Sequence, residues 1–286
     1  MLGRITVGML FLLLVWGNLV AGMKAGLGCP DWPLCHGRVL PPFRVDIYME
    51  FMHRVIAAAS TVLLAVFSYR RFKAYSGWSK AVPVLAVLLV AAAIVMGGLV
   101  VLLGLPVQLT TVHFMAALTV FLLAAYMLLF DGTAAPARFS VRGPCGIYIG
   151  MGALVFFQAA LGSYVRHSGA GLSCPDFPTC MGSIIPHVQN ALVLAHLSHR
   201  LLAGIVFVTV FTFYASTFLD TRLRRSHGLA VVLVALATAE VIAGMTVVLS
   251  GLYYWATALH LAIALLMLLT ITVMWSREMK ADEVTP

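Results

Sequence analysis

Four histidines share one kind of position, near the same end of a long apolar segment, and two of them repeat the other two further along the chain. Two facing imidazoles at one depth between neighbouring helices can bind a haem iron from both faces. A zinc ion would need more His, Cys or carboxylate ligands around it. The pattern therefore favours two haem sites, and the alternative is four buried histidines with hydrogen-bond partners. The pairs are His53 with His113 and His199 with His260.

A carboxyl group accompanies the first histidine pair. Glu50 lies three residues before His53, so the two side chains project from one face of a helix. Beside a haem ligand, a carboxyl group can position water, transfer protons or stabilise a cationic intermediate. A carboxylate that is only stabilised by a helix N-terminus is the alternative. The equivalent position in the second half holds His196, so we expect two sites with different roles.

Two arginines directly follow histidines of the two pairs, and one further acidic residue interrupts an apolar segment. Arg54 and Arg200 could form charged hydrogen bonds with haem propionates, although extension of their side chains to the membrane surface explains them equally well. Glu240 has no acidic counterpart, because Ala93 occupies the equivalent position in the first half. The sequence assigns no role to Glu240 or to His196.

Four of the five cysteines form two pairs with the same spacing, and each pair lies in a loop with two prolines that turn the chain tightly. The pairs are Cys29 with Cys35 and Cys174 with Cys180. A disulfide is favoured over a metal site in each loop, because both loops fall on the expected extracytoplasmic side, where disulfides persist. The remaining thiol, Cys145, is expected to be a small buried residue.

The composition of the chain indicates which kind of element must position these side chains. Of 286 residues, 62% are hydrophobic and only 10% are charged, against about 45–50% and about 25% in soluble domains. A water-soluble fold of this size could not bury so much apolar surface, so we expect a membrane protein. The formal net charge is +8. Because the basic residues cluster in short loops between apolar segments, the charge indicates membrane orientation and excludes nucleic-acid binding.

Eight apolar segments are long enough to cross a bilayer, which takes about 20 residues each. Lipid offers no hydrogen bonds to the backbone, so the predicted fold class is an all-α polytopic membrane protein with eight transmembrane helices. The first segment follows Arg4 in the manner of a secretory signal. The fifth has the same place in the second half, so we expect the first to be retained. The predicted spans are 5–23, 48–69, 81–103, 108–130, 145–166, 190–219, 228–250 and 253–275.

Twelve of the 18 lysines and arginines fall on one side of the predicted spans. This distribution makes that side cytoplasmic, with both chain termini, and places the cysteine loops and haem sites toward the extracytoplasmic side of a plasma membrane. The twelve are Arg4, Arg70, Arg71, Lys73, Lys80, Arg138, Arg142, Arg222, Arg224, Arg225, Arg277 and Lys280.

The chain contains an internal repeat at an offset of 145–147 residues. Residues 26–35 read GLGCPDWPLC and recur at 171–180 as GLSCPDFPTC, and the histidines described above recur as well. Because four spans return the chain to the side where it began, the halves have the same orientation, and we expect two duplicated four-helix bundles. Their predicted ranges are 1–130 and 145–286, joined by a cytoplasmic linker at 131–144.

Together these features resemble those of the haem A synthase family of cytochrome oxidase biogenesis, over nearly the whole chain. The shared features are the eight spans in two halves, the GLxCPDWPxC-type loop and the Glu-x-x-His-Arg element. The resemblance implies an enzyme that oxidises a methyl group of haem O to a formyl group, through a hydroxymethyl intermediate, to give haem A. It implies that the first half holds haem O, with His53 and His113 as iron ligands and Glu50 as the catalytic carboxylate.

The resemblance further implies that the second half holds haem B through His199 and His260. It implies that Cys29 and Cys35 assist haem transfer or catalysis. A haem O synthase and an electron-transfer partner are the implied partners, and a homo-oligomer is compatible with them. One segment departs from the family, since residues 20–26 lack its Arg-x-Thr-Gly-like run, whereas residues 165–171 are closer to it. The departure affects contacts to the edge of the first haem and leaves the iron ligands unchanged.

Two other functions would also explain the paired histidines. One is a non-catalytic di-haem electron-transfer cytochrome, and the other is a chaperone that carries haem without altering it. Neither explains why Glu50 in one half is replaced by His196 in the other, so the enzyme is the favoured interpretation.

Overall fold

The computed structural model describes residues 1–130, 140–184, 186–187 and 190–282. Eight helices are long and apolar enough to span a membrane, and this part of the chain contains no β-structure beyond two isolated bridges. The predicted all-α fold class is therefore confirmed. The helices are α1 (Leu2–Gly22), α2 (Val45–Ala74), α3 (Ala81–Leu102), α4 (Val107–Leu129), α5 (Pro144–His167), α6 (Ala191–Leu219), α7 (His227–Leu249) and α8 (Tyr254–Asp282).

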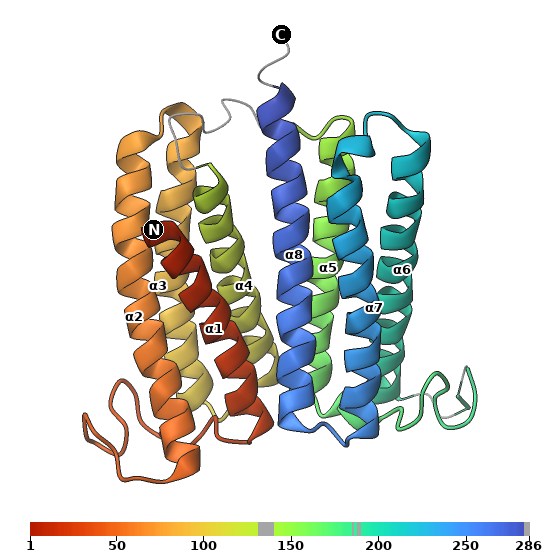
Figure 1. The fold of residues 1–286 in the computed structure, drawn as a ribbon. Coiled ribbons are helices and arrows are strands. Elements are labelled where there is room, and N and C mark those ends of the chain that lie inside the picture. Colours follow the sequence, from red (N-terminus) through yellow and green to blue (C-terminus); the bar gives the residue numbers. More distant parts are fainter. Residues whose placement is uncertain (131–139, 185, 188–189, 283–286) are drawn as a thin grey trace. The chain divides into compact units, whose positions relative to one another are not determined.

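The chain divides into two compact units, Met1–Ala137 and Arg138–Pro286, with four of the long helices in each (Figure 1). In the first unit, α1 and α3 each pack against both α2 and α4, and in the second, α5 and α7 each pack against both α6 and α8. Each unit is thus a four-helix bundle with the same order of neighbouring helices. The boundary falls within the predicted linker 131–144, of which residues 131–139, Arg138 included, lie outside the described part.

Helix ends differ from the predicted spans mainly where a helix continues past its apolar stretch. α2 begins at Val45 and ends at Ala74, beyond the predicted 48–69, and α8 continues to Asp282 instead of 275. The last turns of α2 carry Arg71 and Lys73. A span predicted from hydropathy ends before such charged turns. α6 begins within one residue of its prediction, because the Asn190 side chain accepts hydrogen bonds from the first backbone N–H groups of that helix, at 2.9–3.0 Å.

A buried tyrosine closes each bundle at the end away from its cysteine loop. The Tyr75 hydroxyl donates to the Phe130 carbonyl oxygen at 2.7 Å in the first bundle. In the second bundle, the Tyr148 hydroxyl lies 2.8 Å from the Ser226 hydroxyl. These hydrogen bonds connect the helices at this end of each bundle. The loops and the four histidines lie at the opposite end, where we expect the chemistry.

Candidate functional site

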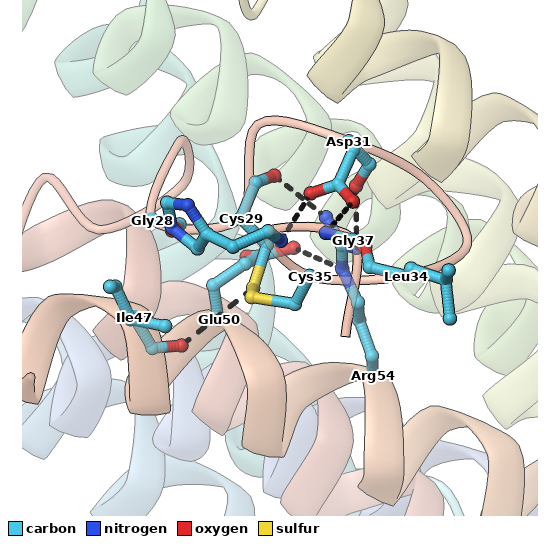
Figure 2. Close-up of a disulfide and its surroundings, with 10 residues drawn as sticks. Gly28, Cys29, Asp31, Leu34, Cys35, Gly37, Ile47, Glu50 and Arg54 are labelled. Carbon is cyan, nitrogen blue, oxygen red and sulfur yellow. Dashed lines mark hydrogen bonds and ion pairs between the residues drawn. A yellow bond between two sulfur atoms is a disulfide. The ribbon is translucent and has the colours of Figure 1, made fainter. Parts of the chain in front are cut away.

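The first cysteine loop is closed by a disulfide and by an internal turn. Cys29 and Cys35 are bonded, as predicted, and the two oxygens of the Asp31 carboxylate accept the backbone N–H groups of His36 and Gly37, at 2.6 and 2.7 Å (Figure 2). These hydrogen bonds, that from Gly37 above all, hold the pKa of Asp31 below its ordinary value. Gly37 has a φ of +68°, a conformation that glycine adopts without steric cost.

Arg54 fastens this loop to α2. Its Nη1 donates to the carbonyl oxygens of Asp31 and Leu34, at 2.8 and 2.7 Å, and its Nη2 donates to that of Cys29, at 2.9 Å. The Nε atom donates to Oε1 of the buried Glu50, at 3.1 Å (Figure 2). The guanidinium group therefore fixes the disulfide loop and the carboxyl group with respect to each other. Pairing of Arg54 with a haem propionate stays a prediction.

The second cysteine loop repeats this construction. Cys174 and Cys180 form the second predicted disulfide, and Asp176 accepts the backbone N–H groups of Met181 and Gly182, at 2.6 and 2.9 Å. It also accepts the Thr179 hydroxyl. This hydroxyl and then the Gly182 N–H are the main reasons that the pKa of Asp176 is lowered to about 2.

Arg200 fastens the second loop to α6 in the same way. Its Nη1 donates to the carbonyl oxygen of Thr179 and its Nη2 to that of Cys174, both at 2.7 Å. The residue one turn earlier differs, because His196 stands where the first bundle has Glu50. Nδ1 of His196 bonds the Ala170 carbonyl oxygen at 2.9 Å, so this buried ring belongs to the loop contact. The two arginines have a structural role in common. Only the first bundle has a carboxyl group, that of Glu50, one turn before its arginine.

Each of the four predicted ligands packs against a glycine of a neighbouring helix. A Cβ atom on any of these glycines would lie 2.9–3.1 Å from an atom of the imidazole ring, closer than ordinary packing allows. The absence of side chains there lets the rings lie across the helix interfaces. In the sequence, Gly97 recurs as Gly244 at an offset of 147 and Gly17 as Gly162 at an offset of 145, and the second of these pairs is a signal that the sequence analysis missed. The contacts are His53 with Gly17, His113 with Gly97, His199 with Gly162 and His260 with Gly244.

The structure brings the histidines together in the predicted pairs. In the second bundle the ring centroids of His199 and His260 lie 6.4 Å apart. Because a metal–imidazole bond is about 2.0–2.1 Å long, this separation leaves room for one metal ion between the rings. In the first bundle, His53 and His113 are close enough to interact electrostatically. The described residues contain no group of three or more His, Cys, Asp or Glu side chains that could bind a metal ion.

The second histidine of each pair has its Nδ1 atom beside an oxygen atom. Nδ1 of His113 lies 3.0 Å from the Ala93 carbonyl oxygen, which can only accept, so Nδ1 carries the proton and Nε2 has a free lone pair. Nδ1 of His260 lies 3.1 Å from Oε1 of Glu240. Metal-binding histidines are commonly oriented in this way through the other ring nitrogen.

Two residues near the second pair were given no role in the sequence analysis. The Gln158 side-chain amide donates to the His199 carbonyl oxygen at 3.0 Å. The buried Nε atom of Arg166 has no hydrogen-bond partner among the described residues. The repeat aligns these positions with Leu13 and Ala21, so a comparison of the halves for polar substitutions would have indicated both.

The fold and the site define a class, an all-α membrane protein of two four-helix bundles with partly buried histidine pairs below disulfide-closed loops. A family model described as cytochrome oxidase assembly protein matches residues 42–272. This match covers most of the chain, and the protein belongs to that family.

Curated relatives of this chain carry the name heme A synthase. That of Halalkalibacterium halodurans is 28% identical over 279 residues, which cover 93% of this chain and 92% of the relative. That of Bacillus pumilus is 29% identical over 74% of this chain and 72% of the relative. That of Alkalihalophilus pseudofirmus is 30% identical over 70% of each. The resemblance to the haem A synthase family is confirmed.

Proposed function

We propose that this protein is a haem A synthase that oxidises a methyl group of haem O to a formyl group, through a hydroxymethyl stage. The named relatives and the family support the activity. The observation that carries the assignment of the site is the buried Glu50–Arg54 pair, one turn from His53, in a bundle whose counterpart has His196 instead. A carboxyl group held in one of two matched sites suits a reaction that takes place in that site only.

The first bundle is proposed to bind the substrate, haem O, with His53 and His113 as iron ligands. Two observations support the fit. Gly17 and Gly97 admit the two rings between the helices, since a Cβ atom there would lie 3.0–3.1 Å from them. The bond from His113 Nδ1 to the Ala93 carbonyl oxygen leaves Nε2 of that ring as the nitrogen for iron.

Glu50 is proposed as the catalytic carboxylate for the methyl oxidation. With an electron-transfer partner as the acceptor, the change from methyl to formyl takes one oxygen atom from water and releases four electrons and four protons, and protons leave the carbon in each of the two stages. Arg54 donates to Oε1 of Glu50, so Oε2 is the oxygen that can accept such a proton. Arg54 is itself fixed by three loop carbonyl oxygens, which keeps the carboxyl group in one orientation.

The second bundle is proposed to hold haem B through His199 and His260. The 6.4 Å separation of the rings and the buried, unpartnered Nδ1 of His199 among the described residues support a ligand between them. The unpartnered Arg166 Nε favours an anionic group such as a propionate. When bound, haem B supplies a one-electron redox centre. His196 replaces the carboxyl group, which suits a haem that is not itself oxidised.

We also propose that the protein lies in the plasma membrane with both termini in the cytoplasm and the disulfide loops outside. The distribution of basic residues supports this orientation. The proposed partners are a haem O synthase, which supplies the substrate, and an electron-transfer protein that accepts the electrons removed from it.

Extraction and mass spectrometry of the bound haem test the proposal. The full chain is purified from a host that also makes haem O, beside an empty-vector control. We expect haem A or its hydroxymethyl precursor with the protein and neither in the control. Haem B alone, despite available haem O, would instead indicate an electron-transfer cytochrome, and unchanged haem O would indicate a haem carrier.

A further inference from the structure

A partly buried acidic residue distinguishes the second histidine pair from the first. In the first bundle, Nδ1 of His113 bonds a backbone carbonyl oxygen, that of Ala93. At the equivalent position of α7 stands Glu240, whose Oε1 lies 3.1 Å from Nδ1 of His260. The second bundle therefore keeps a peptide oxygen beside the ring, that of Glu240, and adds a carboxyl oxygen to it.

Among the described residues, the carboxyl group of Glu240 has no partner other than His260. Only 20% of the Glu240 side chain is exposed, and its Oε2 atom is buried without a hydrogen bond among the described residues. A polar group of this kind within a membrane span is costly unless it is paired, and it indicates a function. In the part of the chain that the structure describes, the Glu240 carboxyl group forms one ion pair within 4.0 Å. Its partner in that pair is Nδ1 of His260.

The helix that carries Glu240 also makes room for the ring. Gly244 lies one turn further along α7, on the same face, and a Cβ atom there would lie 3.1 Å from Cε1 of His260. α7 thus contributes a glycine that admits the imidazole and a carboxyl group that contacts its Nδ1 atom. The two contacts leave Nε2 as the ring nitrogen for an iron atom.

We propose that Glu240 is a positioning residue of the haem B site, which accepts the Nδ1–H group of His260 and makes this imidazole a stronger iron ligand. The inference rests on the proposed haem B site of the second bundle. A carboxyl oxygen accepts a stronger hydrogen bond than a neutral peptide oxygen, and hydrogen bonds to metal-bound histidines raise their basicity. A more basic ligand stabilises ferric over ferrous iron, so Glu240 lowers the reduction potential of haem B.

Redox titration of the purified holoprotein tests this role with Glu240→Gln, which keeps the shape of the side chain and removes its charge. We expect haem B to remain bound with its low-spin spectrum. At the midpoint potential of the wild-type protein, we expect the ferrous-to-ferric ratio to rise about tenfold. For a one-electron couple this corresponds to a rise of about 59 mV in the midpoint potential. Glu240→Ala should shift the ratio in the same direction and also lower the haem B content.

Glu278→Gln is the matched control. It removes a carboxyl group that pairs with Arg225, on the helix that carries His260 but 18 residues away, about 27 Å along the helix axis. We expect its ratio to equal that of the wild type. An unchanged ratio in Glu240→Gln, or equal shifts in Glu240→Gln and Glu278→Gln, would overturn the role of Glu240.

Two further measurements separate the possible failures. Haem B that is absent from the wild-type protein, or unaffected by His260→Ala, would overturn the proposed site and this inference with it.

If Glu240→Gln does not fold, Ala93→Glu tests the same effect in the first bundle. That variant places a carboxyl group beside His113, and we expect the ferrous-to-ferric ratio of the haem bound there to fall. A ratio that stays the same would contradict the proposal.

Discussion

The two bundles have the same frame and differ in where each places a carboxyl group. Both have a disulfide loop, an arginine that fastens it, and histidines that face glycines. In the first bundle, Glu50 contacts Arg54, which in turn bonds the loop. In the second, Glu240 contacts His260 on the neighbouring helix. Under the proposed function, the shared frame binds haem in both bundles, and the position of the acid decides what is done with the haem.

The proposed roles would also explain why neither carboxyl group has a counterpart in the other bundle. An acid directed at the iron ligand would tune the potential of a substrate haem without reaching its methyl group. An acid beside the arginine would give a haem that only transfers electrons an unneeded reactive group. His196, bonded to the Ala170 carbonyl oxygen, keeps the loop contact and removes that group.

The largest expected effect comes from Glu50→Ala, which removes the proposed proton acceptor. We expect the yield of haem A and of its hydroxymethyl precursor to fall by about 100-fold or more, while haem O stays bound because its iron ligands are intact. Mass spectrometry of the extracted haem measures both. His196→Ala is the control in the second bundle and should retain conversion. Undiminished product from Glu50→Ala would remove Glu50 from the mechanism.

The histidine pairs give the next largest effect and test whether the bundles bind different haems. His199→Ala or His260→Ala should abolish the low-spin haem B spectrum, with a loss of haem B of more than about tenfold, and should spare haem in the first bundle. His53→Ala is the matched variant and should show the opposite pattern. Haem analysis and absorption spectra of each variant provide the measurement. Haem B that persists in His199→Ala would make the assignment wrong.

The smallest effect concerns the acid stability of the two loops. The pKa of Asp176 is about 2 in the folded chain and ordinarily 3.8, and a lowered pKa means that the folded state binds the proton less readily. Asp176 therefore stabilises its loop above about pH 4, and this contribution is lost as the pH falls from about 4 to about 2. We expect the protection factors of the Met181 and Gly182 amides against hydrogen exchange to fall across this range. Asp176→Asn should show no such transition.

The first loop sharpens this test, because Asp31 accepts two backbone N–H groups but has Leu34 where the second loop has Thr179. Without the hydroxyl group, the amides of the first loop should lose their protection against hydrogen exchange at a higher pH. Leu34→Thr should shift that transition toward the pH of the second loop. Identical transitions in both loops of the wild-type protein would contradict the contribution of the Thr179 hydroxyl.

The sequence by itself determined the eight spans, both disulfides and the class of the protein. These features depend on local or repeated properties. An apolar stretch long enough for a bilayer must satisfy its backbone within one helix, and two cysteines six residues apart in a tight loop have few other partners. The burial of Cys145 and the family resemblance also followed from the sequence. Haem ligation and the catalytic role of Glu50 stay predictions, with geometry that supports them.

Only the tertiary structure decided which groups the polar side chains contact. Sequence spacing placed Arg54 beside a histidine and left its partner open, and the structure directs its guanidinium group to loop carbonyl oxygens. Glu240 had no assigned role until α7 and α8 brought it to His260. Such contacts depend on the rotation and register of one helix against another, and hydrophobic periodicity fixes these too coarsely to place single atoms. The identity of each contact was therefore set by packing between helices.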